Sequence, residues 1–235
     1  IPSAIGGTID LVNNGQMNFL VVIAIVVIII ATVGAIIYVE LGERRVPVSY
    51  SRKVMMQNQK KRVMNYIPIK VNLSGVIPAI FASAILMFPA TVLQGSQNKY
   101  LIMVADYLSP SSYTFNVFMF LFVVFFAFFY ASITFNAKDI SENLKKQGGF
   151  IPGVRPGAST AEFLNEVAGR LTFWGAIYMG LISTLPWLIV KAMGVPFYFG
   201  GVAVLIVVQV AIDTMRKIEA QQYMNKYQTL SAVGL

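Results

Sequence analysis

The sequence predicts an all-α integral membrane protein with five transmembrane helices and long cytoplasmic loops. Of its 235 residues, 57% are hydrophobic and only 12% are charged, whereas a soluble domain carries about 25% charged residues. The apolar residues also gather in long runs, and a helix needs about 20 mostly apolar residues to cross a bilayer. A soluble protein with buried helices seldom has so many runs of this length, so the membrane class is the better interpretation.

Five apolar runs are the predicted spans, at residues 17–39, 71–92, 117–135, 171–190 and 202–215. Residues 1–16 are expected to be the end of a preceding helix and an external loop of a longer polypeptide. A short amphipathic piece near Tyr100 to Leu108 follows the second span. Residues 40–70 and 136–170 are the two predicted cytoplasmic loops.

The second loop carries glycines and prolines in KKQGGFIPGVRPG. These residues exclude a helix there and predict an ordered loop or hairpin. The sequence AEFLNEVAGR behind it predicts a short helix capped by Ser159 or Thr160.

Charge predicts the orientation of the chain. Lys and Arg gather in residues 40–70, in residues 136–170 and after the last span, while the opposite side receives only Lys99 and Lys191. Cytoplasmic loops are enriched in these two residue types. The amino end of the chain is therefore expected outside and the carboxyl end in the cytoplasm.

Several functions are disfavoured by residues that are missing. The chain has no Cys and no His, which excludes the usual zinc, copper and haem ligand sets. No ionisable residue lies in the middle of a predicted span, whereas ion-coupled transporters generally place charges there. Asp213, at the end of its span, is interpreted as an interfacial charge pair with Arg216 or Lys217. The sequence predicts no catalytic residue, metal or cofactor.

Two pairs of carboxylates also lack a catalytic interpretation. Glu40 lies near Glu43, and Glu162 near Glu166, at about one helical turn of spacing. Both pairs are expected to be solvated.

The second span carries the clearest pore signal. Ile77, Ile80, Ala84 and Phe88 recur at helical spacing and form one stripe, with Asn72 and Ser74 expected at the cytoplasmic end of the same helix. An aliphatic ring can gate a pore by excluding water and needs no charge. Simple packing is the alternative. Pro78 and Pro89 predict a bent helix, with Pro78 as its hinge.

The basic loops have two interpretations. Positive charge sets topology and attracts anionic lipid, but loops held on a rigid scaffold often bind partners. Arg155, in the tight sequence PGVRPG, is expected on a turn where it could bind a phosphate or carboxylate through two hydrogen bonds. Ribosomal RNA and an acidic protein are both suitable partners.

Three stretches, PIKVNLSGVIPAIFASAILMFPATV, NLKKQGGFIPGVRPG and VPFYFGGVAVLIVV, resemble the SecY family, the central subunits of the Sec protein-conducting channel. The resemblance covers essentially the whole chain. It implies helices six to ten of a ten-helix channel, with residues 17–235 as the carboxyl-terminal half.

The resemblance implies a role for particular residues. The implied pore ring includes Ile80 and Ile206. The implied lateral gate contains Asn72, Ile77, Ala84, Phe88 and Val92. The implied docking surface for the ribosome and the SecA motor contains Arg44, Arg45, Lys60, Lys61, Arg62 and Arg155.

The resemblance also implies the surroundings of the chain. The expected partners are the amino-terminal half of the channel, SecE and SecG, SecA, the ribosome with its RNA, secretory precursor polypeptides and membrane lipids. The expected location is the plasma (inner) membrane of a bacterium. Such a channel translocates secretory polypeptides and inserts membrane proteins. The alternatives are half of a secondary transporter for small solutes and a non-conducting membrane scaffold.

Overall fold

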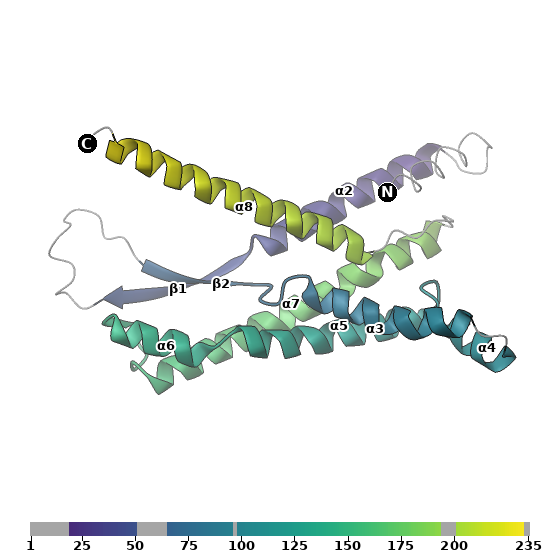
Figure 1. Ribbon diagram of the computed structural model, residues 1–235, viewed down its shortest axis with the longest axis horizontal. Helices are drawn as coiled ribbons and strands as arrows, with labels where there is room; N and C mark the ends of the chain where they lie inside the picture. The colour runs from purple at the N-terminus through teal and green to yellow at the C-terminus, as the bar shows by residue number, and fades with distance from the viewer. Residues whose placement is uncertain (1–18, 51–64, 96–97, 194–200, 233–235) are drawn as a thin grey trace. The chain divides into compact units, whose positions relative to one another are not determined.

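The computed structural model describes residues 19–50, 65–95, 98–193 and 201–232, and these residues are mostly helical (Figure 1). They divide into two compact units, Ile1–Ile37 with Leu185–Leu235 and Tyr38–Thr184. The first unit contains most of α2 (Phe19–Glu40), the end of α7 (Ala158–Met193) and α8 (Gly201–Ala232). The second unit contains all the other elements.

Four helical stretches of the described chain are long and apolar enough to cross a membrane: Leu20–Glu40, Ile77–Gln94, Tyr113–Lys146 and Ala158–Ala192. The fifth predicted span, residues 202–215, forms the first half of α8, whose second half is polar. These helices confirm the helical membrane class. The predicted short helix before the fourth span does not exist separately, because α7 runs through both segments for 36 residues.

Three helices of the second unit follow one another as α3 (Ile77–Gln94), α4 (Lys99–Tyr107) and α5 (Tyr113–Thr134). One face of α3 is buried and consists largely of small residues, among them Ala79, Ala82 and Ala90. This helix packs against α5, because small side chains let two helices approach closely. Helix α7 also approaches α5 closely, since a Cβ at Gly180 would lie only 2.6 Å from the Phe120 ring.

Helix α3 begins later than the predicted second span. Residues 71–76 form bends and a turn, in which Gly75 has a φ of 61°. Pro78 then lies in the first turn of the helix, where its missing N–H breaks no hydrogen bond. The prediction that Pro78 bends the helix is therefore wrong, because Pro78 starts it, while its role as a hinge stays a prediction. The proline inside α3 is Pro89.

A buried polar contact ties the end of α2 to the segment before α3. Asn72 Nδ2 donates to Glu40 Oε1 at 2.6 Å and to the Gly75 carbonyl at 3.2 Å. Glu40 and Asn72 are each only 4% exposed. The prediction that Glu40 is solvated is wrong, because the chain folds back here and the carboxylate accepts from an amide 32 residues away.

The two predicted loops contain a small antiparallel sheet. Its strands are β1 (Glu43–Tyr50), β2 (Asn65–Lys70) and β3 (Gly149–Phe150), in the order β2-β1-β3. Val46 pairs with Ile67, and Ser49 pairs with Phe150. The sheet was not predicted. Pro47 is tolerated in β1 because β3 pairs with Ser49 and Tyr50, so within the described residues no strand takes a hydrogen bond from position 47 on that edge.

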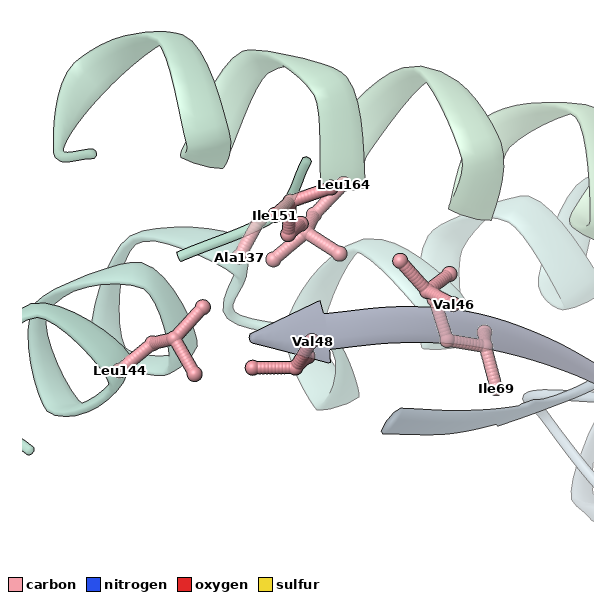
Figure 2. Packing of buried hydrophobic residues seen from close by; sticks show 7 residues of the cluster. All are labelled: Val46, Val48, Ile69, Ala137, Leu144, Ile151 and Leu164. Carbon is pink, nitrogen blue, oxygen red and sulfur yellow. The ribbon is translucent and has the colours of Figure 1, made fainter. Parts of the chain in front are cut away.

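The two loops share one hydrophobic core (Figure 2). Besides the sheet it includes α6 (Ala137–Lys146) and the start of α7. The buried members come from both loops, and they are Val46, Val48, Ile69, Ala137, Leu144, Ile151 and Leu164. We call this part, residues 43–50, 65–70 and 137–170, the loop domain. A shared core requires both loops to lie on the same face of the membrane.

The first prediction concerns this core. Leu164→Ala removes a fully buried side chain and is expected to lower the free energy of unfolding of the loop domain by about 2–5 kcal/mol. The measurement is the rate of limited proteolysis within the loop domain, which rises as open forms become more populated. The neighbouring exposed Asn165→Ala is the matched control, and equal cleavage of the two variants would contradict a shared core.

The second prediction concerns the buried contact before α3. Asn72→Leu leaves the Glu40 carboxylate without that donor, so we expect a loss of about 1–3 kcal/mol and a lower midpoint of thermal unfolding in detergent. The double variant Glu40→Leu with Asn72→Leu should lose less stability than the sum of the two single variants. Strictly additive losses would show that the two side chains do not depend on each other.

Candidate functional site

The predicted pore stripe forms one continuous face of α3. Ile80 is 41% exposed, Phe88 73% and Val92 60%, and Ala84 between them is also exposed. Ile77 is half-buried at the start of the helix. The opposite face of α3 packs against α5, so the stripe faces away from the helix that supports it.

The local sequence explains this orientation of α3. The positions that turn toward α5 are mainly alanines, together with Leu86, whereas the larger Ile and Phe side chains occupy the other face. Close packing is only possible along the face with small residues. Pro89 lies toward the end of the stripe and removes one backbone donor from the helix interior.

Two other predicted residues lie apart from the stripe. Asn72 is not on α3, because it precedes the helix. Its side-chain amide donates a hydrogen bond to Glu40. The prediction that it polarises an end of this helix is therefore wrong. The proposed second ring residue, Ile206, lies in α8 of the first unit and is half-buried, whereas Ile80 belongs to the second unit.

Arg155 is exposed on a short ordered loop of the loop domain. Gly153 and Gly157 on either side of it have φ angles of 86° and 105°, a region that other residues rarely adopt. The Thr160 hydroxyl donates to the Arg155 carbonyl at 2.9 Å, and the Ser141 hydroxyl donates to the Gly157 carbonyl at 2.6 Å. The loop thus holds its backbone in place while leaving the guanidinium in solvent.

Thr160 acts differently from the prediction. Helix α7 starts at Ala158, so Ser159 and Thr160 lie inside it. Thr160 is almost fully buried, and its hydroxyl supports the Arg155 loop instead of capping the helix.

Arg44 and Arg45 are adjacent in β1 and therefore point to opposite faces of the sheet. The Arg45 side chain donates to Glu43 Oε1 at 2.7 Å, and its guanidinium lies 4.8 Å from the centre of the Tyr66 ring. The hydrogen bond to Glu43, followed by the charge interaction with Tyr66, raises the pKa of Arg45 above its ordinary value. The Arg45 guanidinium thus already interacts with Glu43 and Tyr66 of the sheet, although both arginines remain exposed.

Lys60, Lys61 and Arg62 lie outside the described residues. The Asp213 carboxylate accepts from Gln209 Nε2 at 3.3 and 3.4 Å, in place of the predicted charge pair with Arg216 or Lys217. Exposed Glu166 forms an ion pair with Arg170 one helical turn later, as expected of a solvated face.

Sequence reasoning missed the loop domain, although a signal was present. Val46, Val48 and Tyr50 alternate with other residues, as do Ile67 and Ile69, and such alternation is typical of strands with one buried face. Neither segment is long, and Pro47 and Pro68 weaken the pattern. The core that joins the two loops could not be read from either loop alone.

Comparison with known proteins agrees with this architecture. The sequence model of the SecY family matches residues 1–215. A protein translocase subunit SecY from Helicobacter pylori is 68% identical over the whole chain, which covers 56% of that protein. The corresponding subunit from Escherichia coli is 37% identical over 97% of the chain, which covers 53% of it. The chain therefore spans about half the length of the curated relatives it matches.

Solved structures share the fold at low sequence identity. A structure described as a protein-conducting channel matches 82% of this chain with a TM-score of 0.59 at 17% identity, over 48% of its own length. A second structure, from work on the plug domain of the SecY protein, matches 91% of the chain with a TM-score of 0.62 at 19% identity, over 53% of its own length. With the family match over most of its length, the chain belongs to the SecY family.

Proposed function

We propose that this chain is the carboxyl-terminal half of a protein-conducting channel, which translocates secretory polypeptides and inserts membrane proteins. The observation that carries the proposal is the exposed, uncharged stripe of Ile80, Ala84, Phe88 and Val92 on α3. Its opposite face is packed on α5, so the stripe is available to something other than this unit. Membership in the SecY family supports a moving polypeptide as that partner.

The stripe suits a passing polypeptide for physical reasons. Aliphatic and aromatic side chains exclude water and ions when they close on one another, but they bind no particular sequence. A ring that includes Ile80 and Ile206 would fit around an extended chain whatever its side chains are. Ile77, Ala84, Phe88 and Val92 would form part of the lateral gate, through which apolar segments of the substrate pass into lipid.

The loop domain is the proposed docking surface for the ribosome or the SecA motor, either of which would supply the energy for movement. Arg155 is its best-placed residue, because the backbone beside it is fixed while the guanidinium is free to approach a phosphate or carboxylate. Exposed Arg44, and Arg45 once released from Glu43, would extend this surface. Docking there would act on α3 and α7 directly, since both helices lead out of the loop domain.

The proposed channel also needs other subunits and a defined orientation in the membrane. The amino-terminal half would face the stripe of α3, and SecE and SecG would be the other channel subunits. The loop domain and the end of α8 would lie in the cytoplasm of a bacterium, with the amino end of the chain outside the plasma membrane. The concentration of Lys and Arg in the loops supports this orientation.

Two alternatives differ in what they require of α3. A secondary transporter would place polar or charged groups for its solute near mid-membrane, whereas α3 carries no charged residue and its exposed face is mainly apolar. A non-conducting scaffold would leave the same stripe, including Phe88 at 73% exposed, facing lipid or another helix, and the third prediction separates it from a pore.

The third prediction tests the stripe. A photo-crosslinking amino acid at Ile80, in the chain assembled with the amino-terminal half in membranes, is expected to crosslink to a secretory precursor stalled in transit. Contact requires that the side chain line the path of the precursor. The yield is measured from the radiolabelled precursor on gels.

Leu121 of α5 is the matched control, because it is also aliphatic and 55% exposed but lies on the face of α5 that turns away from α3. The pore proposal requires crosslinks at Ile80 and none at Leu121. A silent Ile80 with a demonstrably stalled precursor would mean that the stripe is a packing surface.

The fourth prediction tests docking. Arg155→Ala removes a charged donor whose hydrogen bonds are worth about 1.5–3 kcal/mol, so binding of SecA or ribosomes to membranes is expected to weaken by about tenfold to a hundredfold. Lys138→Ala removes the same charge from an exposed site on α6 and should have a smaller effect. Equal losses would indicate that the partner responds only to net charge.

A further inference from the structure

Helix α4 carries a stripe of apolar and aromatic side chains that is largely exposed in the described chain. Tyr100 is 80% exposed, Met103 57%, Val104 47% and Tyr107 55%. These positions follow the spacing i, i+3, i+4 and i+7, which places them on one face of the helix. Ala105, on another face, is fully buried where α4 packs against α3 and α5.

The turns at both ends of α4 are held by side-chain hydrogen bonds. The Asn98 side chain caps the helix by accepting from the Tyr100 N–H at 3.1 Å. Beyond the other end, Asn116 of α5 donates to the carbonyls of Pro110 and Ser112 at 3.0 and 2.8 Å. Because the buried Ala105 lies on the face of α4 that meets α3 and α5, the stripe turns away from these two helices.

The flanking helices determine what lies beside the stripe. Both α3, which ends at Gln94, and α5, which begins at Tyr113, belong to stretches able to cross a membrane. The 18 residues of α3 extend about 27 Å, close to the thickness of the hydrocarbon core of about 30 Å. The nine residues of α4 therefore connect two span ends at one membrane boundary, far too short a helix to cross the bilayer itself.

We propose that α4 is an interfacial helix, which lies in the membrane surface on the face opposite the loop domain and inserts this stripe among the lipids. Tyrosine is enriched at that depth because its ring is apolar and its hydroxyl remains in contact with water. Met103 and Val104 lie between Tyr100 and Tyr107 along the stripe, and Asp106 lies on another face of the helix. An amphipathic helix of this kind inserts about 5–10 Å into the boundary between headgroups and acyl chains. Because α4 directly follows α3, such an anchor would set the depth of α3 in the bilayer.

This inference depends on the membrane class and not on the channel function, so the two can fail separately. The test uses the absence of cysteine from the chain. Met103→Cys or, in a separate protein, Asp106→Cys is labelled with an environment-sensitive fluorophore, and the chain is assembled with a cysteine-free amino-terminal half in vesicles of phosphatidylethanolamine and phosphatidylglycerol. Quenching is compared between lipids that carry a nitroxide near the glycerol backbone and iodide in the water.

A lipid anchor predicts that shallow nitroxide lipids quench the label at position 103 several-fold more than the label at position 106, while iodide does the reverse. Strong iodide quenching at both positions would overturn the proposal, because α4 would then stand in water. Weak quenching at position 103 by both the nitroxide lipids and iodide would also overturn it, because another protein would then cover the stripe. Tyr107→Cys, on the same face, serves as a second probe and must behave like Met103→Cys.

Discussion

The loop domain depends on apolar side chains that two distant parts of the chain contribute to a single core. Val46 and Val48 come from the first loop, and Leu144, Ile151 and Leu164 from the second. Burying these side chains together helps to offset the entropy of ordering both backbones. Once they fold together, the sheet fixes the start of the segment that leads to α3, and the packed α6 fixes the start of α7. The position of the helices in the second unit is thus linked to a core outside the membrane.

A second constraint acts where the chain passes from this domain into the apolar helices. The backbone at Val71 passes so close to α7 that a Cβ at Gly175 would lie 2.8 Å from the Val71 carbonyl oxygen. Asn72 beside it is bound to Glu40. Buried polar groups are costly without partners. The segment at Val71 and Asn72 can therefore pass α7 in few conformations. Helix α3 therefore starts from a fixed point, whereas its stripe remains open along the rest of its length.

At Arg155 and on α3, one part of the site is held by contacts within the chain and another part is exposed. Thr160 holds the Arg155 carbonyl and Ser141 holds the Gly157 carbonyl beside it, while the Arg155 side chain is exposed. Helix α3 is likewise packed on one face and exposed on the other. Arg45 differs, because its ion pair with Glu43 and its contact with Tyr66 must weaken before it can bind a partner. Exposed ion pairs of this kind contribute little to stability because water screens them, so a strong acidic partner could displace Glu43.

The sequence by itself determined the membrane class, the apolar stripe of α3 and the exposed turn at Arg155, because these features depend on local composition, helical spacing and Gly and Pro positions. Only the tertiary structure decided that Glu40 and Asn72 are paired and buried, that Pro78 starts α3 and does not bend it, and that the two basic loops form one domain with a sheet. Those outcomes depend on residues far apart in the chain, such as the hydrogen bond between Glu40 and Asn72 and the core to which Val48 and Leu144 both belong. Local pattern carries no information about which distant segments share a core.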